Sequence, residues 1–118
     1  MTVKGVGIDI AEVKKFASFK KNGEDRFLSN NFTEKELEYC FSFADSSIHL
    51  AATFAAKEAV WKAFGRADML QSAIEVRRNG SGYPTVWIKN RPQKSILLSI
   101  SHTTETAVAV AIMTNRKK

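Results

Sequence analysis

The chain of 118 residues has the composition of one soluble globular domain, with 44% hydrophobic and 25% charged residues. Its formal charge of +6, from 18 Lys and Arg against 12 Asp and Glu, favours an acidic partner such as a nucleic acid, an anionic membrane, a phosphorylated ligand or an acidic protein. No apolar run is long enough to span a bilayer, no signal-peptide pattern begins at Met1, and the lone Cys40 excludes an internal disulfide, so we expect residues 1–118 to form a single cytoplasmic domain.

The first segment, residues 2–10, is β-prone and ends in an apolar run that encloses Asp9. Two interpretations fit this aspartate: a carboxylate that caps the next helix, or a metal ligand at the end of a strand. Residues 12–21 are expected to form a basic amphipathic helix. Phe19 lies among its lysines, an arrangement typical of a protein-docking face, although a charged helix face is more often simply solvated.

Two further helices are expected in the middle of the chain. One lies within residues 30–43, because Thr33 followed by Glu36 is a capping-box pattern. The other runs from Ser46 to Gly65, since alanines and long side chains favour helix, no proline interrupts it, and a glycine stands where a helix should end.

The two stripes of the long helix differ in character. One carries small residues that would let another backbone approach closely, namely Ala52, Ala56, Ala59 and Ala63. The other places Glu58 and Lys62 one turn apart on a partly apolar face. This spacing fits a surface ion pair, which contributes about 0.2–0.5 kcal/mol, and it also fits a pair that has a function.

The C-terminal half contains four β-prone runs, at residues 74–78, 85–88, 96–101 and 106–113. A strong turn signal, Asn-Gly-Ser-Gly, separates the first two. His102 follows the third run, where a histidine is either an ordinary surface residue or a ligand contact. The order of the elements predicts an α+β fold in which an antiparallel sheet packs on a long central helix.

Short motifs recur in a definite order along nearly the whole chain. They are Gly7-Ile8-Asp9-Ile10 with Glu12, Phe32-Thr33-Glu34-Lys35-Glu36, Ala55-Ala56-Lys57-Glu58-Ala59 with Lys62 and Gly65, Gly82-Tyr83-Pro84, and Ser99-Ile100-Ser101-His102 with Ala107-Val108-Ala109. Together they resemble the holo-acyl-carrier-protein synthase family, the small trimeric 4′-phosphopantetheinyl transferases. Each motif alone is a weak match, whereas the ordered set is specific.

The resemblance implies transfer of 4′-phosphopantetheine from coenzyme A to a serine of an acyl carrier protein, with Mg²⁺ and with release of 3′,5′-ADP. In that family frame Asp9 and Glu58 are the metal ligands, and Lys62 contacts the diphosphate and completes the catalytic set. Mg²⁺ suits this assignment because it binds one or two carboxylates together with waters and substrate phosphates. The other contacts to coenzyme A implied by the resemblance are Gly65, Gly82, Pro84 and His102.

The resemblance also implies a homotrimer with sites between subunits, and an acidic carrier protein that meets the basic first helix. The residues available for that docking are Lys14, Lys15, Phe19, Lys20, Lys21 and Arg26. Two positions depart from the family pattern, which usually has arginine at the positions of Lys15 and Thr53. Loss of an arginine at position 53 should weaken coenzyme A binding unless another cation, such as Lys57 or Arg66, takes its place.

Two other functions are compatible with parts of the sequence. A non-catalytic relative that binds coenzyme A or a carrier protein is the alternative motivated by Thr53. A nucleic-acid-binding domain is suggested by the positive charge alone. Because the chain has no recognised nucleic-acid motif and its basic residues are not interleaved with stacking aromatics, we expect neither a nucleic acid nor a membrane as the partner.

Overall fold

The computed structural model describes residues 1–21, 25–66 and 68–116. Its elements in chain order are β1 (Val3–Glu12), the 3₁₀ helix η1 (Val13–Phe16), α1 (Arg26–Asn31), α2 (Glu34–Phe41), α3 (Ser46–Phe64), the 3₁₀ helix η2 (Gln71–Ala73), β2 (Ile74–Arg78), β3 (Pro84–Ile88), β4 (Arg91–Pro92), β5 (Ile96–His102) and β6 (Thr106–Thr114). The predicted α+β class, with antiparallel strands packed on a long central helix, is confirmed. Among the described residues, no helix combines the length and the apolar character needed to cross a membrane.

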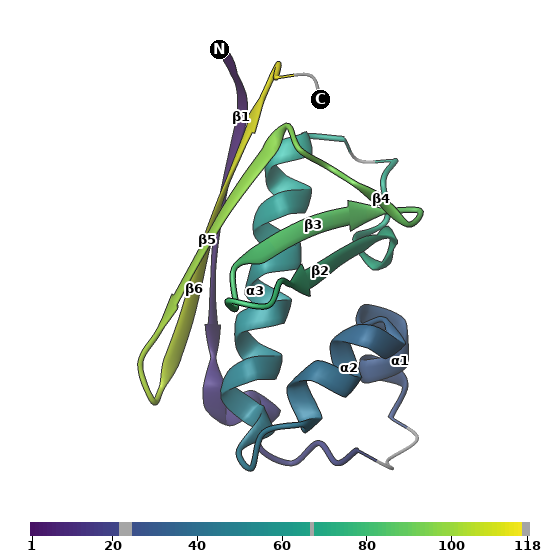
Figure 1. The fold of residues 1–118 in the computed structure, drawn as a ribbon. Coiled ribbons are helices and arrows are strands. Elements are labelled where there is room, and N and C mark those ends of the chain that lie inside the picture. Colours follow the sequence, from purple (N-terminus) through teal and green to yellow (C-terminus); the bar gives the residue numbers. More distant parts are fainter. Residues whose placement is uncertain (22–24, 67, 117–118) are drawn as a thin grey trace.

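The strands form two antiparallel sheets, whereas the sequence predicted one. The larger sheet has the order β1-β6-β5, and the smaller one has the order β2-β3-β4. The larger sheet runs along one side of α3, while β2 and β3 and the short helices α1 and α2 lie on the other side (Figure 1). The long helix is therefore the element against which the rest of the molecule packs.

Close packing between α3 and β1 depends on small residues on both elements. The predicted stripe of alanines on α3 is buried, and Gly5 and Gly7 of β1 face it. A Cβ atom on Gly7 would overlap the backbone carbonyl of Ala59, and one on Gly5 would overlap that of Ala63. This contact brings the backbone of β1 against α3 just before Asp9, so it fixes where the aspartate lies relative to the helix.

The ends of the helices follow the predicted capping chemistry. Thr33 accepts a hydrogen bond from the backbone N–H of Glu36, and Glu36 accepts one from that of Thr33, which completes the capping box. Helix α3 begins after Asp45, whose carboxylate accepts a hydrogen bond from the N–H of Ser47, and it ends at Gly65 in the left-handed conformation, with φ of 65°.

The helix predicted over residues 12–21 is wrong. Strand β1 continues to Glu12, which pairs with Thr106 of β6, and only the single 3₁₀ turn of η1 follows it. Val13 and Phe16 are buried beneath this turn, and Phe19 stacks on the ring of Phe27 with a centroid separation of 5.6 Å. Packing of these aromatic side chains outweighs the helical periodicity of the local sequence. The sequence also predicts a turn at Asn22-Gly23, but these two residues lie outside the described part of the chain.

The outer face of the larger sheet, opposite α3, is apolar and exposed. On β1 the side chain of Ile8 is 60% exposed, and its neighbours Val6 and Ile10 are similarly open. The strand register continues this face across β6 through Val108, Val110 and Ile112. A contiguous β-branched surface of this kind is typical of a face that another protein chain covers.

Candidate active site

Asp9, Glu58 and Lys62 are brought together although 49 residues separate the first two in the sequence. Lys62 donates hydrogen bonds to the carboxylate of Asp9 at 3.2 Å and to the backbone oxygen of Ile8 at 3.0 Å. Among the described residues, no ion pair joins Lys62 to Glu58, so the i,i+4 surface pair is not formed. The lysine instead ties α3 to β1, with Glu58 one helical turn away.

The two carboxylates affect one another electrostatically. Burial raises the pKa of Glu58, the negative charge of Asp9 raises it further, and Lys62 lowers it. Both carboxylates are half-buried, and Lys62 supplies one positive charge for two negative ones. The site therefore has an excess of negative charge that a bound cation would relieve.

The donor set fits magnesium. Within the described part of the chain, no three or more His, Cys, Asp and Glu side chains are placed to hold a metal ion together. Structural and catalytic zinc sites use three or four protein ligands, whereas Mg²⁺ usually takes one or two carboxylates and fills its shell with waters and substrate phosphates. Asp9 and Glu58 match the second pattern.

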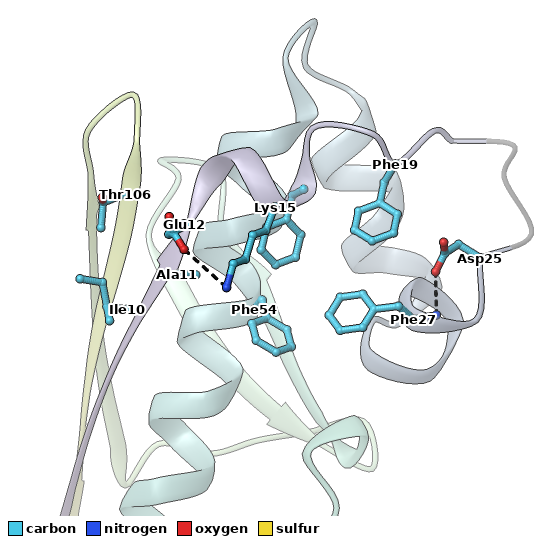
Figure 2. A pocket seen from close by; sticks show the side chains of 10 residues that line it. Ile10, Ala11, Glu12, Lys15, Phe19, Asp25, Phe27, Phe54 and Thr106 are labelled. Carbon is cyan, nitrogen blue, oxygen red and sulfur yellow. Dashed lines mark hydrogen bonds and ion pairs between the residues drawn. The ribbon is translucent and has the colours of Figure 1, made fainter.

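An aromatic hollow of about 700 Å³ lies beside this site. Figure 2 shows the rings of Phe19, Phe27 and Phe54 around it, with Lys15 reaching toward Glu12 at its edge. Phe54 lies on α3 one turn before Glu58, and Ile10 follows Asp9 on β1, so residues of the lining neighbour both carboxylates along the chain. Of the residues predicted to dock a partner, Lys15 and Phe19 line the hollow. The others, Lys14, Lys20, Lys21 and Arg26, are exposed.

A second hollow, of about 410 Å³, lies between the β2–β3 turn and β5. The predicted residues Gly82 and Pro84 line it together with Arg78, Ser81, Tyr83, Leu98, Ser99 and Ile100. The side chain of Asn79 shapes this turn by accepting hydrogen bonds from the backbone N–H groups of Ser81 and Tyr83 at 3.0 and 2.9 Å.

The predicted contacts to coenzyme A do not lie side by side in one protomer. Asp9 belongs to β1, at one edge of the larger sheet, and the second hollow lies on β5, at the other edge. Gly65 is exposed at the end of α3, near the carboxylate side. His102 is exposed at the end of β5. The predicted contacts are thus spread over both edge strands of the larger sheet, the β2–β3 turn and the end of α3.

Of the two cations expected to replace an arginine at position 53, Lys57 is not available for that role. Thr53 is buried, with its hydroxyl 3.5 Å from the Sγ atom of Cys40. Lys57 is also buried and bonds to Glu36 at 2.7 Å. Arg66 lies beyond the end of α3, where it is exposed and paired with Asp68 at 2.9 Å. Substitution by Lys57 is therefore wrong, whereas substitution by Arg66 stays a prediction.

Comparison with known proteins identifies the family. The family model described as the 4′-phosphopantetheinyl transferase superfamily matches residues 5–112. The chain belongs to this superfamily. Curated relatives within it include the holo-[acyl-carrier-protein] synthase of Thermodesulfovibrio yellowstonii, 42% identical over 113 residues that cover 95% of this chain and 99% of the relative. The enzyme of the same name from Chlamydia trachomatis serovar L2 is 44% identical over 115 residues, covering 92% of this chain and 97% of the relative.

Solved structures from the superfamily share the fold. A holo-(acyl-carrier-protein) synthase from Bacillus anthracis in complex with CoA (3′,5′-ADP) has a TM-score of 0.76 and 30% identity, covering 96% of this chain and 97% of that one. The synthase from Helicobacter pylori in complex with coenzyme A has a TM-score of 0.77 and 25% identity, covering 92% of this chain and 99% of that one.

Sequence reasoning missed several residues around both hollows. Phe16, Phe27 and Phe54 form an aromatic cluster with Phe19. These residues belong to separate segments, so no helical or strand periodicity in the sequence indicates that they meet. Arg78 was not singled out either, because one more arginine in a basic chain carries no signal. Only the three-dimensional position of these side chains identifies them.

Proposed function

We propose that this protein is a holo-[acyl-carrier-protein] synthase, which transfers 4′-phosphopantetheine from coenzyme A to a serine of an apo-acyl carrier protein and releases 3′,5′-ADP. The observation that carries this proposal is the convergence of Asp9, Glu58 and Lys62 from β1 and α3. Membership of the superfamily, and relatives with this name that match almost end to end, support the same reaction.

Each residue of the convergent set has a role in the proposed reaction. Asp9 and Glu58 would hold Mg²⁺, and the half-exposed ammonium of Lys62 would contact the diphosphate of coenzyme A. A bound magnesium ion would neutralise the charge that develops on the departing phosphate. The serine hydroxyl releases its proton to solvent as its oxygen forms a bond to phosphorus and the bond to 3′,5′-ADP breaks. Lys62 stabilises the phosphoryl oxygens during this displacement.

We propose the aromatic hollow as the docking place for the carrier protein. The carrier proteins of this enzyme family are acidic, and the hollow has an aromatic lining with Phe19 as an apolar contact. Lys15 lines it together with the acidic Glu12 and Asp25, and the exposed basic residues of the flanking segments are Lys14, Lys20, Lys21 and Arg26. Such an arrangement speeds encounter and fixes orientation. Phe54 lies one helical turn from Glu58, so a carrier protein docked against Phe54 would have its serine close to Glu58.

We further propose a cytoplasmic homotrimer with each site built between two subunits. Two observations support the assembly: the apolar outer face of the larger sheet is exposed, and the two groups of coenzyme A contacts lie on opposite edges of that sheet. Lys62 and Gly65 of one protomer would then share one coenzyme A with Gly82, Pro84 and His102 of its partner. The buried thiol of Cys40, whose pKa burial raises to about 11, fits an inert residue in a reducing compartment.

Mass spectrometry of the carrier tests the reaction. The wild-type protein, incubated with an acidic apo-carrier, coenzyme A and Mg²⁺, should add one phosphopantetheine to the carrier, and Glu58→Gln should abolish this addition. Asp68→Asn removes an exposed carboxylate that pairs with Arg66 and is not among the proposed metal ligands, so it serves as the matched control. If the trimeric wild-type protein binds coenzyme A but adds no mass to any of several carriers, the chain is instead a non-catalytic relative.

A further inference from the structure

Among the described residues that line the second hollow, Arg78 is the one with a charged side chain. It is the last residue of β2, on the same face as the buried Ile74 and Val76, so its side chain points toward the helices. Its guanidinium lies over the ring of Tyr39, 5.1 Å from the ring centroid. The half-buried side chain is therefore held in place by an aromatic face.

This arginine lacks the carboxylate partner that its neighbours have. Arg77, on the opposite face of β2, pairs with Glu75 at 2.6 Å, and Arg66 pairs with Asp68. Within the described residues, no ion pair or side-chain hydrogen bond involves Arg78. A half-buried guanidinium with unused donors, beside an open hollow, is suited to an anionic ligand, because its planar fork matches carboxylate and phosphate groups.

Two histidines, His49 and His102, lie within electrostatic reach of one another and of this guanidinium. The pKa of His49 is lowered, first by burial and then by the positive charges of Arg78 and His102, whereas Asp45 raises it. His102 is two residues beyond Ile100, which lines the hollow, and on the same face of β5. An anion bound at this end of the sheet would interact favourably with the positive charge of Arg78.

The chemistry of coenzyme A indicates which anion this is. The molecule carries phosphate at two places, the diphosphate and the 3′ position of its ribose. Asp9, Glu58 and Lys62 account for the diphosphate, and the second hollow lies on the other edge of the sheet, where a partner subunit would bring it to the nucleotide end. We propose that Arg78 binds the ribose 3′-phosphate and thereby distinguishes coenzyme A from dephospho-coenzyme A.

This proposal rests on the proposed function and supplies a residue that its site lacked. Position 53 offers a buried threonine in place of the family's arginine, and Lys57 and Arg66 are engaged elsewhere. The positive charge of Arg78 acts on the thiol of Cys40, which contacts Thr53, so the guanidinium lies on the same side of α3 as that position. Arg78 is therefore placed to replace the missing cation.

Titration calorimetry with coenzyme A and dephospho-coenzyme A tests the assignment in the intact protein. The wild-type protein should bind coenzyme A more tightly. Arg78→Gln should weaken coenzyme A binding by roughly 10- to 100-fold, the range expected for a lost charge-assisted hydrogen bond, and leave dephospho-coenzyme A unchanged. Arg78→Lys should lie between the two. Arg77→Gln, with the same charge change on the opposite face, should preserve the preference.

Kinetics separates this proposal from the proposed function. In Arg78→Gln the KM for coenzyme A should rise while kcat is kept, because the 3′-phosphate is remote from the reacting phosphorus. If the wild-type protein transfers phosphopantetheine but both Arg78 variants keep the wild-type preference, or lose affinity equally for both ligands, the assignment of Arg78 is overturned and the enzyme function stands. Absence of wild-type transfer would instead overturn the function itself.

Discussion

Replacing Lys57 by methionine tests the buried ion pair that holds three elements together. The ammonium of Lys57, on α3, lies 2.7 Å from the carboxylate of Glu36, on α2, and both residues are 2% exposed. Glu36 also accepts hydrogen bonds from the backbone N–H groups of Thr33 and of Val76, at the centre of β2, each at 2.8 Å. The pair therefore fixes α3, the helix that carries Glu58, against its neighbours.

The expected cost follows from burial. Removing one partner of a buried pair leaves the other charge uncompensated and typically destabilises a protein by about 3–5 kcal/mol. In the wild-type protein burial already raises the pKa of Glu36 while Lys57 lowers it, so removing the lysine raises that pKa further. The folded variant then keeps a proton that the unfolded chain releases, and its stability falls by up to about 1.4 kcal/mol for each pH unit above the unfolded pKa.

Urea unfolding at a fixed protein concentration, between pH 5 and pH 8, measures both effects. Lys57→Met should lose stability relative to the wild-type protein, and the loss should grow as the pH rises. The double variant Lys57→Met with Glu36→Gln removes the ionisable group and should abolish the added pH dependence. A Lys57→Met variant within about 1 kcal/mol of the wild-type protein, with an unchanged pH profile, would refute the reasoning because a lost buried pair costs more than that.

Three further changes test the packing, the electrostatics and the assembly. Gly7→Ala should destabilise the protein by about 3 kcal/mol, because its Cβ meets helix backbone, whereas Gly80→Ala, where the Cβ has open space, should be nearly neutral in the same urea titrations. Asp9→Asn should lower the pKa of Glu58 by removing a nearby negative charge, which NMR titration of the carboxyl carbons would detect; an unchanged value would place the two groups apart. Ile8→Glu should dissociate the proposed trimer in analytical ultracentrifugation, and a variant that sediments as the wild-type protein does would remove the outer face from the interface.

The parts of the fold that the sequence predicted are those set by local chemistry. The capping box of Thr33 and Glu36 and the left-handed end of α3 at Gly65 both follow from residue types at fixed spacing, and both are confirmed. These features need no knowledge of distant neighbours.

The parts that were wrong depend on contacts between distant segments. Residues 12–21 have helical periodicity, yet Glu12 pairs with β6 and Phe19 stacks on Phe27, so the strand is extended and the helix reduced to a turn. Helix α1 was missed because its six residues are too few to show a periodic pattern. The local sequence likewise does not show that the strands divide into two sheets, because that depends on which distant strands pair.

In the candidate site, too, the sequence motifs identify residues, but they do not show which way each side chain points. The family resemblance links Asp9, Glu58 and Lys62 from distant stretches, and in the structure Lys62 contacts Asp9 while the charges of both act on Glu58. Their roles in a site stay predictions. Lys57 is adjacent to Glu58 and of the same type as Lys62, but its direction on the helix buries it in the ion pair with Glu36. A charged residue in a motif is therefore a candidate site residue, and the direction of its side chain on the helix decides whether a ligand can contact it.

Divalent-ion binding measured by electron paramagnetic resonance, with Mn²⁺ in place of Mg²⁺, tests the central claim most directly. We predict that the wild-type protein binds the ion in the presence of coenzyme A, and that Asp9→Asn and Glu58→Gln each abolish this binding while Asp68→Asn retains it. Equal ion binding by all four proteins would contradict the assignment of the two carboxylates, and with it the mechanism of transfer.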